Sequence, residues 1–296
     1  MKADLLLLLT AAIWGFAFVA QRIGMSHMGP FTFNAIRFTL GAISLLPVLF
    51  WLRKRGLEQS TKKLRQSFLP GLATGLALFA GASLQQIGLM GTSAGKAGFI
   101  TGLYVIFVPL LGLLWGRRTH LAHWVGAVLA VAGLYLLSVQ TGFVVSKPDL
   151  IVLAGAFMWA VHVHLIARYA SIVGPIRLSV LQFAICGLLS AIAGAAFETF
   201  QMHSIVDGLG TLLYSTFLSV GVAYTLQVVA QRWADPTHAV IILSLEGTFA
   251  ALGGWLILNE VISPRGLWGC ALILVGMLIS QALGNQRRIN KMDQHV

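Results

Sequence analysis

The stretch ADLLLLLTAAIWGFAFVAQRIGMSHMGP (residues 3–30) contains a long apolar run that ends in Gly-Pro. A helix needs about 20 mostly apolar residues to cross a hydrocarbon core of about 30 Å. The run begins like a signal peptide, but it continues through Trp14, Phe16 and Phe18 without a clear small-residue cleavage site. We therefore expect an uncleaved membrane-spanning helix over residues 4–22.

Similar apolar runs recur along the whole chain, separated by short segments rich in Gly, Pro or charge. They predict an all-α membrane protein with ten transmembrane helices, over residues 4–22, 32–52, 68–90, 97–116, 121–140, 149–168, 177–197, 208–230, 238–258 and 265–284. The only long hydrophilic stretch is 53–67, which leaves no room for a separate soluble domain.

The composition supports the membrane interpretation and excludes several classes. Of the 296 residues, 57% are hydrophobic and 10% are charged, with a mean hydropathy of +0.85, whereas a soluble domain carries roughly 25% charged residues. The net charge of +11 lies mostly in short loops, which argues against nucleic-acid binding. Cys186 and Cys270 have no CxxC or His partner at ligand spacing, so we expect no disulfide, metal or cofactor.

Lysine and arginine are distributed unevenly between the two sides. If the N-terminus is cytoplasmic, cytoplasmic segments hold 15 of the 20 Lys and Arg residues, the other side holds four, and Arg37 lies inside the second span. Positive charge accumulates in cytoplasmic loops, so both termini are expected in the cytoplasm. The basic run 53–65 belongs to this signal, with contact to anionic lipids as a secondary effect.

The two halves of the sequence resemble each other. A shift of 145 residues pairs Trp14 with Trp159 and Gly29-Pro30 with Gly174-Pro175, and near the ends of the halves a shift of 143 pairs Gly126 with Gly269 and Gly133 with Gly276. Because each half has five expected spans, the halves must enter the membrane from opposite sides. We therefore expect a 5+5 inverted-topology repeat, a design common in secondary transporters, with repeats over 1–145 and 146–284 and a cytoplasmic tail over 285–296.

Four stretches resemble the EamA-type families of the drug/metabolite transporter superfamily. They are AAIWGFAFVAQRIG (11–24), GPFTFNAIRF (29–38), AGKAGFITGLYVIFVPLLGLLWG (94–116) and LEGTFAALGGWLILNEVISPRGLWGCALILVGMLI (245–279). The resemblance implies ten spans, a central cavity, residence in a bacterial inner membrane, and export or exchange of amino-acid-like or drug-like metabolites. Glu246-Gly247 departs from the usual Glu-Pro of this family, and Arg117-Arg118 stands where the second half has Asn259-Glu260.

The expected function is secondary active export or exchange of a small metabolite by alternating access, and not enzymatic catalysis. Uptake by the same fold is an alternative, and a non-transporting receptor or scaffold and a membrane-embedded enzyme are more distant ones. No G-x-x-x-x-G-K-[ST] motif occurs, so a gradient or exchange must supply the energy. Gly91-Thr-Ser-Ala-Gly95 matches a hydrolase motif, but Ser93 falls in a short turn between two apolar runs.

Ionisable residues inside spans are costly and usually face a cavity or a partner. For Glu246, proton coupling or cation recognition stands beside a structural role, hydrogen-bonded or paired with Arg37. For Arg37, snorkelling to lipid headgroups is favoured over binding a substrate carboxylate. His162 and His164 point in different directions on a helix and cannot chelate one metal. A hydrogen-bonded structural role is favoured for either, and one of them is also a cavity candidate.

Neutral polar and aromatic residues complete the list of cavity candidates. Trp14 and Trp159 lie in mid-span, where interfacial anchoring does not apply. They could stack on an aromatic or cationic substrate or pack at the interface between the repeats. The remaining candidates are Gln85, Gln86, Tyr104, Tyr224 and Gln227. His120 and His123 are expected to form a solvated cluster in a cytoplasmic loop.

Overall fold

The computed structural model describes residues 2–58, 64–116, 119–138, 146–199, 201–259 and 263–293, with side chains for all but 64, 137–138 and 281–293. Its elements are α1 (Lys2–Gly24), α2 (Pro30–Lys54), α3 (Leu64–Leu89), α4 (Ala94–Gly102), α5 (Tyr104–Leu114), α6 (Leu121–Ser138), α7 (Lys147–Val173), α8 (Pro175–Phe197), α9 (Met202–Asp207), α10 (Leu209–Leu213), the π-helix η1 (Tyr214–Tyr224), α11 (Thr225–Ala230), α12 (Pro236–Leu243), α13 (Glu246–Leu258) and α14 (Pro264–Asp293).

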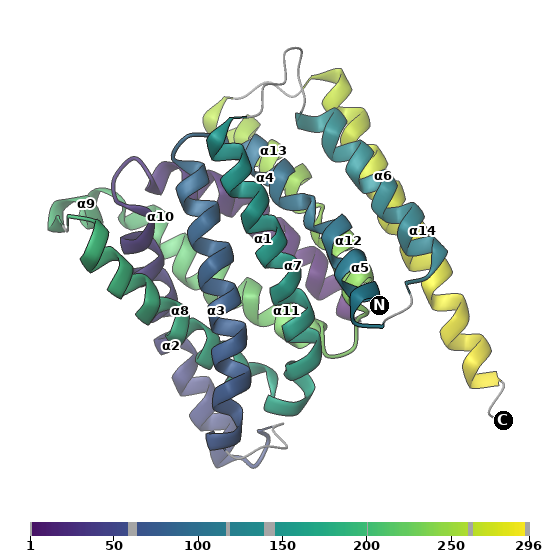
Figure 1. Ribbon diagram of the computed structural model, residues 1–296, viewed down its shortest axis with the longest axis horizontal. Coiled ribbons are helices and arrows are strands. Elements are labelled where there is room, and N and C mark those ends of the chain that lie inside the picture. Colours follow the sequence, from purple (N-terminus) through teal and green to yellow (C-terminus); the bar gives the residue numbers. More distant parts are fainter. Residues whose placement is uncertain are drawn as a thin grey trace.

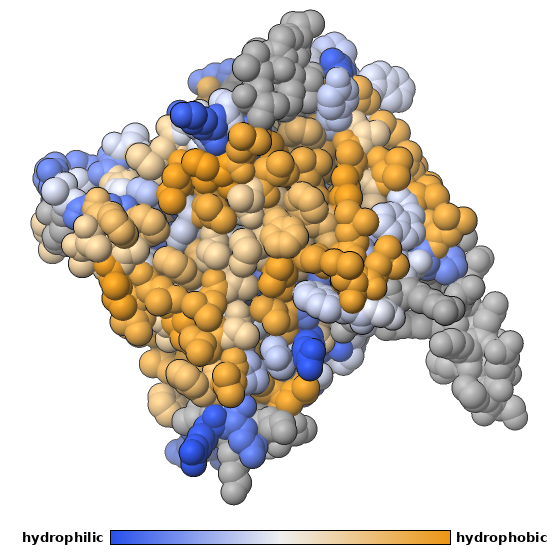
Figure 2. All heavy atoms as spheres, viewed as in Figure 1, coloured by the Kyte–Doolittle hydropathy of each residue, from blue (hydrophilic) through white to orange (hydrophobic). Residues whose placement is uncertain are grey.

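The described part of the chain has eight helical stretches that are long and apolar enough to cross a membrane. The shorter apolar segments Leu121–Leu136 and Pro264–Ser280 fall at the expected fifth and tenth spans. Figure 2 shows apolar side chains over the middle of one face and hydrophilic ones gathered towards its edges. Apolar side chains as large as Leu114 and Phe197 are 80% exposed, as contact with lipid requires.

Proline marks the starts of several helices. The expected breaks before Pro30, Pro175 and Pro236 become helix starts, with proline in the first turn, where its missing N–H costs no hydrogen bond. At the other end of the chain, α14 runs on to Asp293, so the helix does not stop at the span end expected at 284. Residues 117–118, 260 and 294–296, which also entered the sequence analysis, lie outside the described residues.

Helices far apart in sequence pack in antiparallel pairs. Along one edge of the bundle, α6 and α14 lie side by side (Figure 1). Cβ atoms built on Gly126 and Gly133 would lie 2.8 Å and 2.5 Å from the carbonyl oxygens of Gly276 and Gly269. The shift of 143 residues that pairs these glycines in the sequence also maps each of the two contacts onto the other. The same glycine contact therefore occurs twice. Small residues allow this close approach of backbones.

Contacts elsewhere in the bundle follow the same exchange of halves. Helix α2 packs on α8, α3 packs on α7, and α1 packs on η1 and α11. Likewise α1 packs on α13, while α7 packs on α4 and α5. When the two halves of the sequence are interchanged, each of these helix pairs corresponds either to another pair named here or to itself.

Two expected spans are broken helices, which the sequence analysis did not foresee. The span 97–116 divides at Leu103 into α4 and α5, and the span 238–258 divides at Leu245 into α12 and α13. Both breaks contain short i→i−3 bonds, from Leu103 N to the Ile100 carbonyl and from Leu245 N to the Ile242 carbonyl. Such tightening within a helix often marks a functional hinge. The two breaks occupy corresponding positions in the two halves of the chain.

Candidate functional site

The two broken helices border a cavity in the interior of the bundle. About 40 Å³ of it is open to the centre of a water molecule, room for about three waters. Its lining comes from spans of both halves and consists of Trp14, Phe18, Gln21, Gln85, Thr101, Tyr104, Trp159, Val163, Ser219, Tyr224, Gln227, Leu243 and Glu246.

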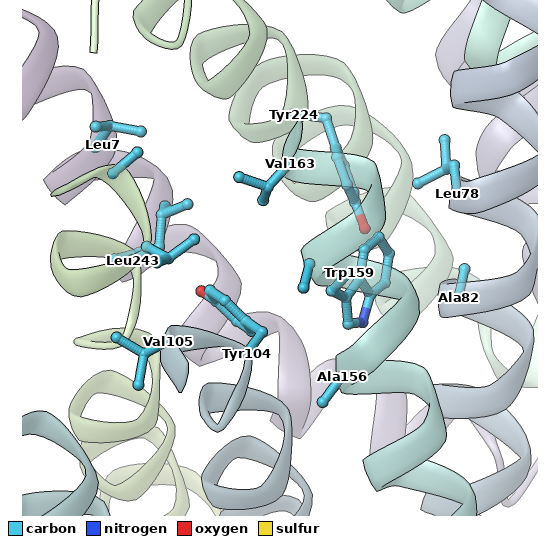
Figure 3. Close-up of a cluster of buried hydrophobic side chains, with 14 of the residues drawn as sticks. Leu7, Leu78, Ala82, Tyr104, Val105, Ala156, Trp159, Val163, Tyr224 and Leu243 are labelled. Atoms are coloured by element: carbon cyan, nitrogen blue, oxygen red, sulfur yellow. The ribbon is translucent and has the colours of Figure 1, made fainter. Parts of the chain in front are cut away.

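Aromatic rings form a continuous wall of the cavity. Trp14 and Tyr224 pack with ring centroids 4.6 Å apart and planes inclined by 60°, and Trp159 lies 6.0 Å from Tyr224. In Figure 3 the Tyr224 hydroxyl lies beside the Trp159 indole, with Val163 close by. The two tryptophans that the sequence repeat pairs therefore meet on either side of one tyrosine.

A chain of side-chain hydrogen bonds holds part of the wall in place. The Trp159 indole donates to Gln85 Oε1 at 2.9 Å, and Gln85 Nε2 donates to Gln21 Oε1 at 3.1 Å. On the other side, the Trp14 indole donates to the Ser219 carbonyl at 3.3 Å. These bonds fix the orientations of both indoles.

Tyr104 and Glu246 are the first residues after the two helix breaks, so they occupy corresponding positions in the two halves. Both are 3% exposed and line the same cavity. The Tyr104 hydroxyl is close enough to the Glu246 carboxylate to interact with it. However, no hydrogen bond of good geometry reaches this hydroxyl or Glu246 Oε1 in the described part of the chain. A buried polar atom left unsatisfied costs about 1–3 kcal/mol, which favours a ligand, water or proton at this place.

The chemistry of the lining favours a positively charged or amine-bearing solute. Glu246 is the only acidic residue that lines the cavity, and no Lys or Arg lines it in the described part of the chain. Indole and phenol faces attract ammonium groups by cation–π interaction, and a buried carboxylate needs a proton or a counter-charge. Hydroxyl and amide groups such as those of Thr101 and Gln227 can hydrogen-bond the neutral parts of a solute.

Seven sequence-predicted candidates line this cavity, and three do not. Arg37 is 1% exposed, donates to Asn34 Oδ1 at 2.9 Å, and lies 4.7 Å from the Phe38 ring centroid. The favoured snorkelling role of Arg37 was therefore wrong: its guanidinium lies within the protein, against an aromatic ring. The described residues contain no ion pair between Arg37 and Glu246, which removes one of the structural roles considered for Glu246.

The other two candidates lie behind the cavity wall. Gln86 is fully buried and contacts Met25 Sδ at 3.6 Å. His162 bonds Gln182 Oε1 at 2.8 Å, and its ring lies 5.7 Å from Trp159, so its role here is to support the wall. His164 bonds the Val108 carbonyl at 2.8 Å.

Phe18 and Gln21 also line the cavity, although they were not among the predicted candidates. Trp14, Phe18 and Gln21 are spaced i, i+4 and i+7, and such residues share one helix face. Once Trp14 is placed in the cavity, this spacing predicts that Phe18 and Gln21 line the cavity too. By contrast, Ser93 accepts from Lys96 N as the N-cap of α4, which is a structural role.

Comparisons with known proteins place the chain in a family. The model of the EamA-like transporter family matches it twice, over residues 1–139 and 146–281. An uncharacterized transporter of Archaeoglobus fulgidus is 33% identical over 94% of this chain and 85% of its own length. A probable amino-acid metabolite efflux pump of Escherichia coli is 23% identical, over 94% of each protein.

A solved crystal structure shares the fold, with a TM-score of 0.73 and 20% identity over 94% of this chain and 98% of that one. The family, its transporter relatives and the apolar helices together indicate a multi-pass membrane protein that acts on a small-molecule substrate from within a lipid bilayer, and the names of the relatives are those of transporters, not enzymes. The chain belongs to the EamA-like transporter family.

Proposed function

We propose that the chain is a secondary transporter that exports a small, amine-bearing metabolite through the central cavity by alternating access. The observation that carries this proposal is the pair of broken helices, which bring Tyr104 and Glu246 into one cavity with hydrogen-bonding capacity to spare. Interrupted helices in corresponding positions of two repeats mark the substrate sites of many transporters.

The proposed architecture is ten spans in a 5+5 inverted repeat, with repeats over 1–145 and 146–284 and both termini on the cytoplasmic side of a bacterial inner membrane. The antiparallel pairing of α6 with α14 through the doubled glycine contact supports it. Reporter fusions after residues 60 and 206 should lie on opposite sides of the membrane. Finding both on the same side would refute the inverted repeat.

Glu246 is the proposed coupling residue. A buried carboxylate can exchange a proton for an ammonium group, but it cannot hold both charges comfortably at once. This competition would link substrate movement to a proton gradient. Export is favoured over uptake by the relatives named as efflux pumps. An inverted repeat is mechanically reversible, so the gradient would set the direction.

Three related solutes separate the substrate classes. In proteoliposomes with an imposed pH gradient, labelled phenethylamine carries only an ammonium group, phenylalanine carries an ammonium and a carboxylate, and phenylpropionate carries only a carboxylate. We expect transport of phenethylamine, weaker transport of phenylalanine, and none of phenylpropionate. Preference for phenylpropionate would contradict the proposed class, and gradient-driven flux of none of the three would contradict transport of this class altogether.

The Glu246→Gln substitution tests the coupling role. It preserves the size of the side chain and removes its charge, so pH-driven flux of phenethylamine should fall to the level of empty liposomes. The control is Asp207→Asn, which changes an exposed carboxylate on α9 and should leave the flux unchanged. Undiminished pH-driven flux in the Glu246→Gln variant would rule out this carboxylate as the coupling group.

A further inference from the structure

Both broken helices begin in the same way, at a distance from the cavity. Helix α4 starts after Ser93 and α12 starts after Asp235, and each N-cap side chain accepts backbone N–H bonds from the first turn. The third helical residue is basic in each case, Lys96 in α4 and His238 in α12. A single shift of 142 residues relates the two basic residues, the two N-caps (Ser93 and Asp235) and the two helix breaks (Leu103 and Leu245).

Each basic residue pairs with an aspartate on a helix that carries a cavity tryptophan. Lys96 Nζ lies 2.7 Å from Asp149 Oδ2 in the first turn of α7, and His238 Nε2 lies 3.0 Å from Asp4 Oδ1 in the first turn of α1. The shift that relates the two cavity tryptophans relates these two aspartates as well. We call these contacts the lysine pair and the histidine pair.

The two pairs lie at opposite ends of the bundle. Helix α1 has 23 residues, a length of about 35 Å, and the histidine pair is at its first turn. At its other end Arg22 donates to the Leu89 carbonyl at 2.7 Å, next to the turn that leads into α4 and the lysine pair. At each end of the bundle, a basic residue–aspartate contact therefore links the start of a broken helix to a neighbouring helix: α4 to α7 at one end and α12 to α1 at the other.

The two pairs differ in the hydrogen bonds around them and in whether their charge depends on pH. Around the lysine pair, Asp149 is 2% exposed and also accepts from Thr92 Oγ1 at 3.0 Å and from Ser146 N at 2.7 Å. Of the two basic side chains, histidine is the one whose charge ordinarily changes between about pH 5 and pH 8. The attraction in the lysine pair is thus constant, and that in the histidine pair depends on protonation.

A buried serine links the histidine pair to a second histidine. Ser280 Oγ of α14 lies 3.0 Å from His238 Nδ1 and 2.8 Å from His123 Nδ1 of α6. Ser280 is fully buried and His123 is 9% exposed, so the expectation of a solvated loop cluster at His123 was wrong. The serine hydroxyl has one proton and can donate to only one of the two rings.

This geometry distinguishes two states of the network. When His238 is neutral, its Nε2–H donates to Asp4, its Nδ1 accepts from Ser280, and Ser280 in turn accepts from His123. When His238 is protonated, Nδ1–H donates to Ser280, whose hydroxyl then donates to a neutral His123. Both states satisfy the Ser280 hydroxyl and the two ring nitrogens of His238, but two protonated rings 5.9 Å apart would repel each other.

Among the described residues, Asp235 is a second acidic group near the network, and its carboxylate interacts electrostatically with His123. From α6, His120 lies behind His123 with ring centroids 6.3 Å apart, and from α12 itself Asp235 is engaged by the backbone N–H groups of its own helix. Helices α5 and α7 also contact α12. Of their titratable residues, Tyr104 lines the cavity and His164 bonds the Val108 carbonyl.

We propose that His238, Asp4, Ser280 and His123 form a one-proton binding site, separate from the central cavity, which strengthens the contact between α12 and α1 when it is occupied. The site lies at the end that the Lys and Arg distribution assigns to the cytoplasm. Because α12 leads through the helix break directly to Glu246, the proton state at this end biases the position of the half-helix that precedes the cavity carboxylate. The lysine pair gives the opposite end no such dependence on pH.

The sign of the effect follows from the charges. In its protonated form His238 attracts Asp4 as an ion pair. In its neutral form, which rising pH favours, only a hydrogen bond from the uncharged ring to the carboxylate remains. The contribution of the histidine pair to stability is therefore greatest at low pH and falls as pH rises.

A double-mutant cycle in purified protein tests the site without any transport measurement. The variants are Asp4→Asn, His238→Gln and the double substitution, and the readout is the thermal midpoint from tryptophan fluorescence in detergent. At about pH 5.5 we expect a coupling of about 2–4 °C between the two positions, and a smaller one at about pH 8. A coupling of equal size at both pH values would overturn the proposal.

The lysine pair supplies the matched control and a reciprocal exchange. The cycle of Asp149→Asn with Lys96→Gln should give the same coupling at both pH values. Lys96→His should make that coupling depend on pH, and His238→Lys should remove the dependence from the histidine pair. If Lys96→His leaves the Asp149 coupling unchanged between the two pH values, the identity of the basic residue does not create the switch and the proposal fails. Failure here would leave the transport proposal intact.

Discussion

Helices α4–α5 and α12–α13 are two versions of one broken helix with different chemistry. Each begins with a side-chain N-cap, carries a basic residue at its third position and breaks about ten residues later beside the cavity. The first version places Lys96 at its start and Tyr104 after its break, whereas the second places His238 and Glu246 there. The two broken helices share their backbone features, but both residues with a proposed proton-binding role, His238 and Glu246, belong to α12–α13.

The difference shows what the repeat conserves and what it leaves free. Caps, breaks and glycine contacts are backbone features that both halves need in order to pack. The side chains at the start and at the break can diverge because they face a cavity or an end of the bundle. Substitutions at shared backbone features should therefore be equally harmful in the two halves, and substitutions at diverged positions should be unequal.

The largest effect is expected at the shared glycine contact between α6 and α14. Gly133→Leu and Gly276→Leu would each place a Cβ within 3 Å of a backbone carbonyl of the partner helix, at 2.5 Å and 2.7 Å respectively. Overpacking against backbone cannot be relieved by rotamer changes, so each should cost roughly 3 kcal/mol or more. The yield of monodisperse protein in size-exclusion chromatography should fall equally.

Gly210→Ala serves as the control, because a Cβ at Gly210 meets nothing within 4 Å in the described part of the chain, and it should purify like the original protein. If only one of the two leucine variants aggregates, the two glycine contacts are not equivalent, and the symmetry of the packing is broken at this point.

A middle-sized and unequal effect is expected at the two residues that follow the breaks. Tyr104→Phe removes a hydroxyl but no charge, so the KM for phenethylamine should rise about tenfold, the equivalent of about 1.4 kcal/mol, while flux remains pH-driven. Glu246→Gln should abolish the driving effect of pH. Comparing initial rates with and without a pH gradient separates the two roles, and loss of pH coupling in the Tyr104→Phe variant would show that the roles are not divided in this way.

The smallest effect concerns the paired tryptophans. Trp159→Phe leaves Gln85 Oε1 without the 2.9 Å indole bond and should lower stability by about 1 kcal/mol. Trp14→Phe removes a longer bond of 3.3 Å to a main-chain carbonyl and should cost less. Thermal midpoints in detergent measure the difference. Equal losses would mean that the polar chain from Trp159 through Gln85 adds nothing beyond ring packing.

Much of the candidate site was within reach of the sequence. Trp14 and Trp159 were found from the repeat, and Glu246 from the cost of a carboxylate in a span. Arg37 was misjudged because its position near a span end suggested a lipid headgroup as its partner. Its actual partners, Asn34 and the rings of Phe33 and Phe38, lie within one turn of it. The proposed proton-binding network connects four helices through His123, His238, Ser280 and Asp4. No residue spacing within a single helix could have predicted it.

The sequence by itself determined the membrane environment, the approximate spans, the Gly-Pro breaks and the repeat, because hydropathy and turn chemistry act over at most about 20 neighbouring residues. Only the tertiary structure decided where the expected spans 97–116 and 238–258 break and which polar side chains meet. The physical reason is that lipid tails are as apolar as leucine, so the hydrophobic effect does not dictate which face of a helix turns inward. That choice is made by close glycine contacts and by hydrogen bonds such as Gln85 to Gln21, between residues 64 positions apart.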